Sequence, residues 1–207
     1  IANVYSRGPA TLAQSAASIG ELAPGRFEFG IGSGSQPIIE MWNNGRFIKP
    51  ATRVKEMVQF LRPALAGERV VFKGETFQVD GFRLSQPPPS VPRIHVAALR
   101  EGMLTVAGEV GDGAIINWLS ADDVKKVAPI VREAGPDKEI VARIFVAPNP
   151  DKAQVRAMAK FAIAAYLNVP VYAAFHEWLG RGPKLAAMWE AWKKGDRKAA
   201  IAAIPDE

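Results

Sequence analysis

The sequence contains no cysteine and only two histidines. The absence of cysteine excludes disulfide bonds, thiolate catalysis and cysteine-based metal sites. The two histidines, His95 and His176, lie far apart in the sequence, which disfavours a histidine-rich metal centre. We therefore predict no metal site, and any chemistry that the protein performs must use other groups.

The sequence also lacks long runs of one residue class. No block of about five or more consecutive Lys and Arg residues occurs, and the formal net charge of +5 is modest for 207 residues, so nucleic-acid binding is disfavoured. There is no apolar run of about 18 residues and no signal-peptide pattern, which argues against a membrane-spanning helix and against secretion. These absences predict a cytoplasmic protein.

What the chain does contain is typical of a globular domain. Hydrophobic residues make up 48% of the sequence and charged residues 23%, which is enough apolar content to bury one sizeable core. One domain is the default expectation. The chain starts inside a segment that reads as a strand, "IANVY", and stops after "AAIPDE", where a further element would be expected, so it reads as a fragment of a larger protein.

Strand and helix patterns alternate along most of the sequence. Five segments rich in buried-type apolar residues predict strands, and each is followed by helical apolar spacing, which is typical of a parallel α/β fold. The right-handed crossover rule leaves an open doubly wound sheet or a barrel, and the repeated unit length favours a barrel. The predicted strands are "IANVY" (1–5), "RFEFGI" (26–31), "RIHVAA" (93–98), "GAIINW" (113–118) and "EIVARIFVA" (139–147), and the predicted helices cover 9–22, 50–67, 101–110, 121–134 and the region from 150 onward.

Three segments depart from this alternation. Residues 37–50 read as an irregular loop. Between about 68 and 90 the apolar period changes to two, which predicts a hairpin outside the main core with turns at Lys73–Gly74 and Asp80–Gly81. From about 150 to 205 the chain is rich in alanine and aromatic residues at helical spacing, which favours helix packing or a subunit interface over a ligand-binding box.

Candidate functional residues follow the predicted strands, because parallel sheets and barrels carry their sites at the carboxyl ends of the strands. Ser33 and Ser35 offer hydroxyl groups beside glycines, which suits either the close approach of a flat ring or a flexible loop. Leu99 and Arg100 lie between a strand and a helix, where backbone N–H groups and the guanidinium suit either a phosphate seat or a plain turn. The strand-end clusters, which we expect to share one edge, are Tyr5–Arg7, Ser33–Ser35, Ala98–Arg100, Asn117–Trp118 and Ala147–Pro148.

Other interpretations of these residues are disfavoured. "GIGSGS" (30–35) lacks the third glycine and the immediate helix of a dinucleotide-binding loop, and it lacks the lysine of a P-loop. A serine hydrolase would need a histidine base near Ser33, but His95 lies mid-strand, where we expect a hydrogen-bonded core or pocket-wall residue. Asp112 precedes a strand and is expected to shape the turn there.

Several of these segments, in this order and spacing, resemble one family. "SRGPATLAQSAASIGELAPGRFEFGIGSG" (6–34), "RVKEMVQFLRPALAGERVVFKGETFQV" (53–79), "VPRIHVAAL" (91–99) and "AGEVGDGAIINW" (107–118) resemble the bacterial luciferase-like monooxygenase superfamily, above all its members that depend on the deazaflavin coenzyme F420. The resemblance implies an α/β fold, a (β/α)8 TIM barrel, that is incomplete in this chain because strands 1, 2 and 8 are missing. Residues 1–207 would then form a single partial barrel domain, with the hairpin as an excursion and the helical segment as an insertion.

The resemblance also implies a cofactor site. In the family a flat flavin or deazaflavin lies in the mouth of the barrel, with its phosphate near the fifth strand. The histidine and tryptophan that commonly flank the ring belong to the N-terminal strands, so the catalytic residues are expected upstream of Ile1. The positions that resemble the family's cofactor contacts are Ala2 on the third strand, Ser33 and Gly34 on the fourth, Ile38 after it, and Leu99 with Arg100 as the phosphate-loop pair.

Two departures from the family pattern bear on the reaction. Ser35 stands where relatives that oxidise sugar phosphates often carry a proton-donating acid, and a serine cannot do that work at neutral pH, so sugar-phosphate dehydrogenase activity is disfavoured. The phosphate pair, often Gly-Gly, is Leu99–Arg100, which keeps the backbone donors and adds a guanidinium. The resemblance implies a homodimeric oxidoreductase that transfers a hydride between coenzyme F420 and a small organic substrate. An FMN-dependent monooxygenase and a non-catalytic flavin-binding homologue stay open as alternatives.

Overall fold

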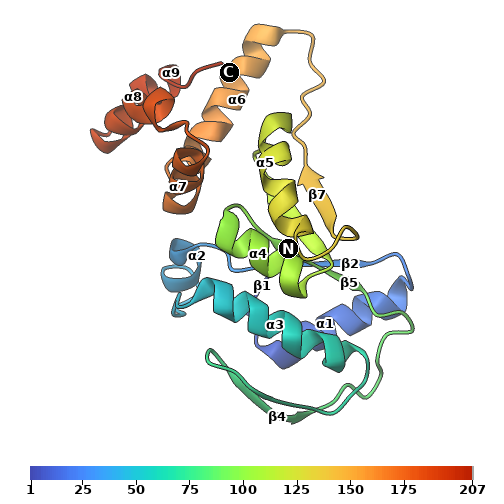
Figure 1. Cartoon of the computed structure of the whole chain (residues 1–207). Helices are drawn as coiled ribbons and strands as arrows, with labels where there is room; N and C mark the ends of the chain where they lie inside the picture. Colours follow the sequence, from blue (N-terminus) through green and yellow to red (C-terminus); the bar gives the residue numbers. More distant parts are fainter. Residues whose placement is uncertain (207) are drawn as a thin grey trace. The chain divides into compact units, whose positions relative to one another are not determined.

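The computed structural model describes residues 1–206, which divide into two compact units, Ile1–Arg143 and a second that begins at Ile144 (Figure 1). The first unit combines a parallel sheet with helices and a hairpin. The regular elements of the second unit are all helices in the described residues. The strand ends that carry the predicted site therefore belong to the first unit.

The core of the first unit is a five-stranded sheet in which every neighbouring pair of strands is parallel. The prediction of a parallel α/β fold is confirmed. β1 and β7 are the two edges of this sheet, so the strands within residues 1–206 do not close on themselves. In spatial order the strands are β1 (Ala2–Asn3), β2 (Glu28–Gly32), β5 (Arg93–Ala97), β6 (Gly113–Asn117) and β7 (Glu139–Arg143).

Both edge strands are shorter than predicted. The last strand was expected to reach Ala147, but β7 ends at Arg143, which pairs with Asn117 at the end of β6. Likewise β1 ends at Asn3, opposite Gly32 at the end of β2. Because each edge strand pairs with one neighbour only, it ends where that neighbour ends.

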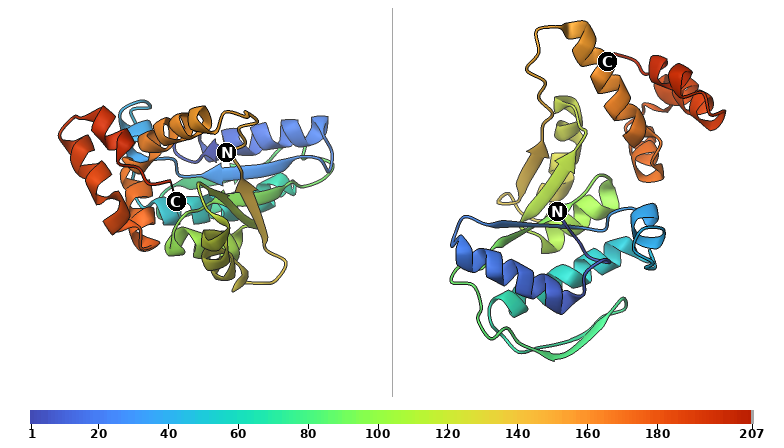
Figure 2. Two further views of the ribbon diagram at one scale, coloured as in Figure 1. Left: turned by 90° about the horizontal axis from the view of Figure 1, so that it is seen from above. Right: turned by 180° about the vertical axis from the view of Figure 1, so that it is seen from behind.

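Four helices pack against one face of the sheet, as Figure 2 shows for the first unit. On that face Ile31, Val96 and Ile116 are almost completely buried together with the apolar stripes of the helices. We call the opposite face of the sheet the inner face, and it carries the alternate residues of each strand. The four helices are α1 (Pro9–Leu22), α3 (Pro50–Leu65), α4 (Glu101–Val110) and α5 (Ala121–Arg132).

The predicted hairpin is present as β3 (Val70–Lys73) and β4 (Gln78–Phe82), which pair antiparallel. It lies on the outer side of α3 (Figure 1), where the rings of Phe60 and Phe72 meet edge-on at 6.4 Å between centroids. The carboxylate of Glu56 on α3 accepts hydrogen bonds from the backbone of the hairpin turn. The hairpin is thus an extension of the helical layer and takes no part in the main sheet.

One of the two predicted hairpin turns is wrong. The turn at Lys73–Gly74 is present, and the N–H of Gly74 donates to the carbonyl of Phe77 at 3.0 Å. Asp80–Gly81 instead lies inside β4, where the pairing register places these two residues opposite the single Val71 of β3. Gly81 has a φ of +70°, so the pair forms a bulge, for which a glycine is as suitable as it is for a turn.

A short helix, α2 (Gln36–Glu40), replaces the start of the loop predicted over 37–50. Pro37 lies in its first turn, where a missing N–H costs nothing. The side chain of Asn43 donates to the carbonyl of Ile38 at 2.7 Å and closes the end of the helix. A single turn held by such local bonds leaves no periodic pattern in the sequence, which is why it was missed.

The second unit confirms the predicted helical tail. Its small core includes the fully buried Met188 and Ala200, and the indole N–H of Trp189 donates to the carbonyl of Leu167 at 3.0 Å, so this aromatic side chain serves helix packing. Among the described helices none alone is long and apolar enough to cross a membrane, and α6 with α7, bent by 101° between them, meet that standard only as a pair. The helices are α6 (Lys152–Leu167), α7 (Pro170–Trp178), α8 (Gly182–Lys193) and α9 (Arg197–Ala202).

Candidate functional site

The carboxyl ends of four neighbouring strands bring most of the predicted site segments together. Because β1, β2, β5 and β6 are adjacent and parallel, the residues after Asn3, Gly32, Ala97 and Asn117 lie along one edge of the sheet. We call it the strand-end edge. Four of the five predicted clusters share it, whereas Ala147–Pro148 belongs to the second unit and does not directly follow a strand.

The inner face beside this edge carries very small side chains. Gly30 and Gly32 on β2 and Ala97 on β5 point to this face, and a Cβ atom on Gly32 would lie only 2.9 Å from that of Ala97. The apolar side chains of Ile1 and Ile115 lie over Gly30. The inner face is therefore apolar and built from small residues at this point, with the Ile1 side chain lying over both glycines.

Sequence reasoning missed Asn3, the residue that joins two of the site loops. Its Oδ1 accepts hydrogen bonds from the backbone N–H groups of Tyr5 and Ser6, at 2.8 and 3.1 Å, and its Nδ2 donates to the carbonyl of Ser33 at 3.2 Å. Gly34 has a φ of +67°, and a Cβ atom there would lie 2.4 Å from Asn3 Nδ2. Only glycine fits that position while the asparagine holds the loop. An asparagine directly before a turn was the available signal.

For two of the predicted cofactor contacts, Ala2 and Ile38, the structure shows surroundings that the sequence did not predict. The side chain of Ala2 packs against the core on the helical side of the sheet, so only its backbone is free to face a ligand. Ile38 lies within α2 and is half-buried, while its neighbour Ile39 is 1% exposed and fills the core.

The predicted phosphate pair lies at the start of α4. Leu99 is half-buried, and Arg100 is the exposed N-cap residue, with an extended backbone and no side chain that caps the helix. The first N–H groups of a helix have no intrahelical partner, and the helix dipole makes that end positive. A Cβ atom on Gly102 would meet nothing within 4 Å, so this helix end is open to a ligand. The arrangement suits an anion, as the phosphate-seat hypothesis requires.

The end of β6 carries a strained residue. Trp118 has a φ of +61°, a conformation that costs a residue with a large side chain on the order of 1–3 kcal/mol. Asn117 immediately before it lies on the inner face, two positions after Ile115. The sequence placed both residues at this edge but gave no sign of the strain.

A polar cluster occupies the opposite edge, where the strands begin. His95 is 1% exposed, its Nδ1 lies 3.3 Å from Glu28 Oε2, and its Nε2 lies 3.0 Å from Glu139 Oε2. The imidazole reaches β7 across Gly113 of β6, where a Cβ atom would lie 2.1 Å from the Glu139 carbonyl oxygen. The prediction of a hydrogen-bonded core histidine is confirmed.

The three side chains of this cluster offer ligand atoms within 4.8 Å of one another, which is within the reach of a metal ion. Both imidazole nitrogens, however, face carboxylate oxygens, as in a histidine that clamps two acids. The hydrogen bond from His95, followed by the contact with Arg93, lowers the pKa of Glu139. We read the cluster as a clamp between β2, β5 and β7.

Asp112 lies at the same edge, as the sequence predicted. Its carboxylate accepts a hydrogen bond from the N–H of Ile94 at 2.6 Å and lies 3.2 Å from the guanidinium of Arg62. Burial, the largest single effect, raises the pKa of Asp112, but these hydrogen bonds and the charge of Arg62 together outweigh it and lower that pKa. Asp112 thus ties a turn to the helical layer and is remote from the strand-end edge.

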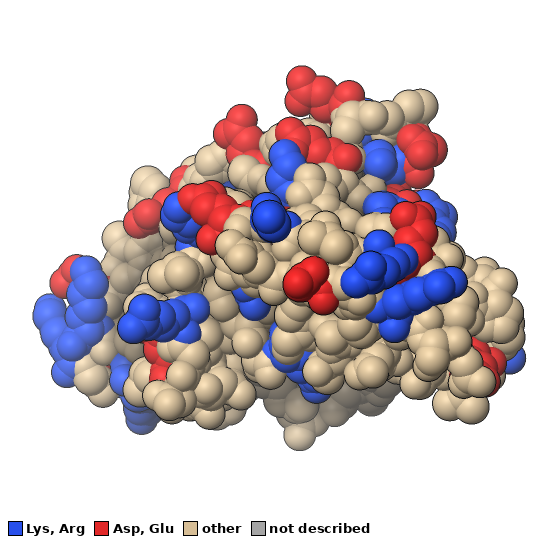
Figure 3. Space-filling model, turned by 90° about the horizontal axis from the view of Figure 1, so that it is seen from below, with Lys and Arg blue, Asp and Glu red and all other residues tan. Residues whose placement is uncertain are grey.

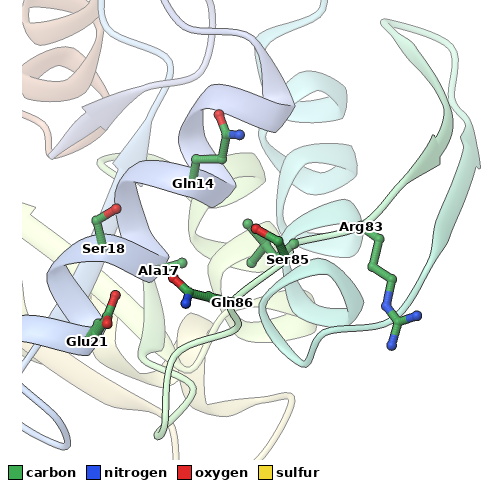
Figure 4. Close-up of a pocket in the computed structure, with 8 residues that line it drawn as sticks. Gln14, Ala17, Ser18, Glu21, Arg83, Ser85 and Gln86 are labelled. Carbon is green, nitrogen blue, oxygen red and sulfur yellow. The ribbon is translucent and has the colours of Figure 1, made fainter.

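Cavities of moderate size open on the first unit. One of about 290 Å³ lies between the C-terminal half of α1 and the segment after β4 (Figure 4), and its lining includes Gln14, Ser18, Glu21 and Arg83. That half of α1 lies toward the edge where the strands begin, so this cavity is not part of the candidate site. Another, of about 230 Å³, lies next to Tyr5.

Basic and acidic side chains are interspersed over the face drawn in Figure 3. The surplus of positive charge therefore forms no single large basic patch on that face, in keeping with the modest net charge of +5.

The sequence matches a known family and several proteins with assigned names. The model of the luciferase-like monooxygenase family matches residues 1–207. The chain is 32% identical over 171 residues to a 5,10-methylenetetrahydromethanopterin reductase of Methanolobus tindarius, covering 79% of this chain and 52% of that protein. It is 34% identical over 164 residues to an F420-dependent hydroxymycolic acid dehydrogenase of Mycobacterium tuberculosis, covering 74% and 45%. The chain therefore spans about half the length of these relatives.

A solved structure shows the same fold. The coenzyme F420-dependent tetrahydromethanopterin reductase of Methanopyrus kandleri superposes with a TM-score of 0.77 at 22% identity, and the match covers 100% of this chain and 66% of that one. This similarity identifies the five parallel strands and their helices as the arrangement found in luciferase-like TIM-barrel proteins.

Proposed function

The chain belongs to the luciferase-like monooxygenase family, and from this premise we propose that the protein is an oxidoreductase that transfers a hydride between coenzyme F420 and a small organic substrate. Two features support the choice of F420. A relative at 34% identity is named as F420-dependent, and the strand-end edge combines an apolar inner face of small residues with the open start of a helix.

The observation that carries the proposal is that an apolar inner face of small residues lies next to an open helix start that suits an anion. Gly32 on β2 and Ala97 on β5 add little side-chain bulk of their own to the inner face, where the Ile1 side chain lies over Gly32, and the open end of α4 with Arg100 follows β5 directly. A ring and its phosphate chain are joined covalently, so a protein that binds both must place these two features side by side.

In this proposal the residues of the chain bind and orient the cofactor, which itself supplies the carbon that gives or accepts the hydride. Ser33 and Gly34 form one wall, and Asn3 fixes that wall by its hydrogen bond to the Ser33 carbonyl. The N–H groups at the start of α4 and the guanidinium of Arg100 hold the phosphate.

Ser35 narrows the range of substrates. It is the N-cap residue of α2, and its hydroxyl cannot serve as a proton donor at neutral pH. We therefore propose that the substrate is not a sugar phosphate whose oxidation depends on an acid at this position.

Titration of the full-length protein with F420 and, separately, with FMN tests the proposal. We expect saturable binding of F420, followed by its fluorescence, and substrate-dependent loss of its absorbance. Turnover with FMN and oxygen uptake would favour the FMN-dependent monooxygenase instead. Binding of neither cofactor would contradict both.

A matched pair of variants tests the anion seat. Arg100→Gln removes the guanidinium and is expected to weaken F420 binding about tenfold, the usual effect of one charge-assisted hydrogen bond. Arg26→Gln removes another exposed arginine, which precedes β2 at the other edge of the sheet, and it should leave the affinity unchanged. Equal affinities for the two variants would remove Arg100 from the site.

A further inference from the structure

The cavity next to Tyr5 is separate from the predicted cofactor contacts. Its volume is about 230 Å³, and none of the predicted contact residues lines it. It opens where the loop after β1, the loop before α3, the start of α3 and the hairpin turn meet. The lining residues are Tyr5, Arg46, Ile48, Arg53 and Thr76.

Arg53 brings a half-buried positive charge to this cavity. Its Nε donates to the carbonyl of Val4 at 3.2 Å, and its Nη1 donates to the carbonyl of Thr76 at 2.7 Å. The guanidinium carbon lies 5.6 Å from the ring centre of Tyr5 and 4.8 Å from that of Phe77. Two neutral carbonyls and two rings position the charge without neutralising it, and within residues 1–206 no carboxylate lies within 4 Å of it.

The nearby carboxylates are already engaged. Glu56 accepts N–H groups of the hairpin turn, at 2.5 Å for that of Glu75. Glu75 in turn forms an ion pair with Lys49. Glu40 accepts the N–H of Phe47 at 3.2 Å. Each of these acids therefore has its own donor, and Glu56, which keeps its charge, attracts Arg53 without forming an ion pair with it.

Arg46 adds a second guanidinium to the same cavity. Its side chain is exposed, and no ion pair or hydrogen bond holds it in the part of the chain that the structure describes. Burial lowers the pKa of Arg53, and it raises that of Tyr5, which keeps the phenol neutral. Two like charges facing a polar hollow repel each other, and an anion between them relieves that repulsion.

We infer that this cavity, the arginine pocket, binds an anionic oxygen group, a phosphate or a carboxylate, through Arg46 and Arg53. A guanidinium presents N–H donors in a fork that matches the oxygens of both groups. The hydroxyl groups of Tyr5 and Thr76 already donate to the Ile48 carbonyl and to Glu56, so the donors that remain for the anion are the two guanidinium groups. The inference rests on the proposed function in one respect, namely which molecule carries the anionic group. That molecule is either the substrate or the cofactor, through one of its acidic parts.

Calorimetric titration of the full-length protein with inorganic phosphate at constant ionic strength tests the arginine pocket. We expect saturable binding that Arg46→Gln weakens about tenfold. Arg46 is the residue to change because it makes no contact that the fold requires, whereas Arg53 holds two carbonyl groups. Arg26→Gln serves as the control for a general loss of one positive charge. No saturable binding, or equal affinity in Arg46→Gln and Arg26→Gln, overturns the inference.

The same titration in the presence of saturating F420 identifies the owner of the anion. The readout is the phosphate binding that Arg46→Gln weakens, because phosphate can also enter the proposed anion seat at the start of α4. If F420 excludes this binding, the acidic group belongs to the cofactor, and if the binding persists with F420 present, the group belongs to the substrate. Either result supports the pocket. F420 binding without phosphate binding overturns this inference alone, while phosphate binding without F420 binding overturns the proposed function alone.

Discussion

The two edges of the same five-stranded sheet are built in opposite ways. Where the strands begin, polar side chains are mutually satisfied, as in the clamp of His95 between Glu28 and Glu139. Where the strands end, the chain has glycines, an uncapped helix and a tryptophan with positive φ. One edge is closed to further partners and the other is open to them.

The difference shows where this fold places stability and where it places binding. A satisfied ion pair network contributes to the folded state and has little left to offer a ligand. Strained or uncapped backbone is retained where something else uses it. Single substitutions can disrupt either edge without the other, with the largest effect expected where the strands begin.

Gly113→Ala should cause the largest loss of stability. A Cβ atom at this position would lie 2.1 Å from the backbone oxygen of Glu139, so β6 and β7 must separate, at a cost of about 3 kcal/mol. Gly102→Ala is the control, because its Cβ meets nothing within 4 Å and alanine favours the helix α4. Urea unfolding measures the stability of both variants. If Gly113→Ala loses no more free energy of unfolding than an ordinary surface substitution, the close packing of β6 and β7 is contradicted.

Gly34→Ala should cost less stability but should also reduce cofactor binding. Its φ of +67° and the contact with Asn3 together are expected to cost about 2 kcal/mol. Gly25→Ala shares the positive φ, at +66°, but has open space around it and should cost only about 1 kcal/mol. F420 affinity should fall in Gly34→Ala alone. An equal fall in both variants would mean that strain, and not the site loop, is responsible.

Glu139→Gln should have the smallest effect, a modest loss of stability at neutral pH together with a changed pH dependence. The pKa of Glu139 is lowered in the folded state, chiefly by the hydrogen bond from His95, so its contribution is present above the ordinary pKa of a glutamate and is lost as the pH falls through the lowered value. Urea midpoints measured from neutral pH down to about pH 3 should therefore fall less steeply in Glu139→Gln. Glu21→Gln, an exposed acid at the end of α1, should reproduce the wild-type slope.

Most of the fold could be predicted from the sequence because its strands and helices carry strong local patterns. The bounds of α4, Glu101–Val110, were predicted to the residue, since a strand end and two glycines frame it. The misses depend on partners that a local pattern does not report. β7 ends at Arg143 because β6 ends opposite it, and Asp80–Gly81 forms a bulge because β3 supplies one residue fewer.

The site was predictable only as far as strand order determines it. Parallel strands bring Ser33–Gly34 and Leu99–Arg100 to one edge whatever their side chains do. The direction of the Ala2 side chain depends on the pairing register, and the strain at Trp118 depends on the loop that follows β6. Asn3 bonds to a loop about thirty residues away, and the arginine pocket joins Tyr5 and Thr76 to Arg53 on α3, so no local periodicity encodes these contacts.

Asn3 has a consequence for cooperativity. Its amide nitrogen holds the loop that carries Ser33, and its oxygen holds the backbone of Tyr5, which lines the arginine pocket. An anion that shifts Tyr5 must therefore pull on the cofactor loop through a single side chain. Any such coupling is reciprocal, so the factor by which an anion changes the affinity for the cofactor is the factor by which the cofactor changes the affinity for the anion. Asn3 would set the strength of that coupling between the two ligands.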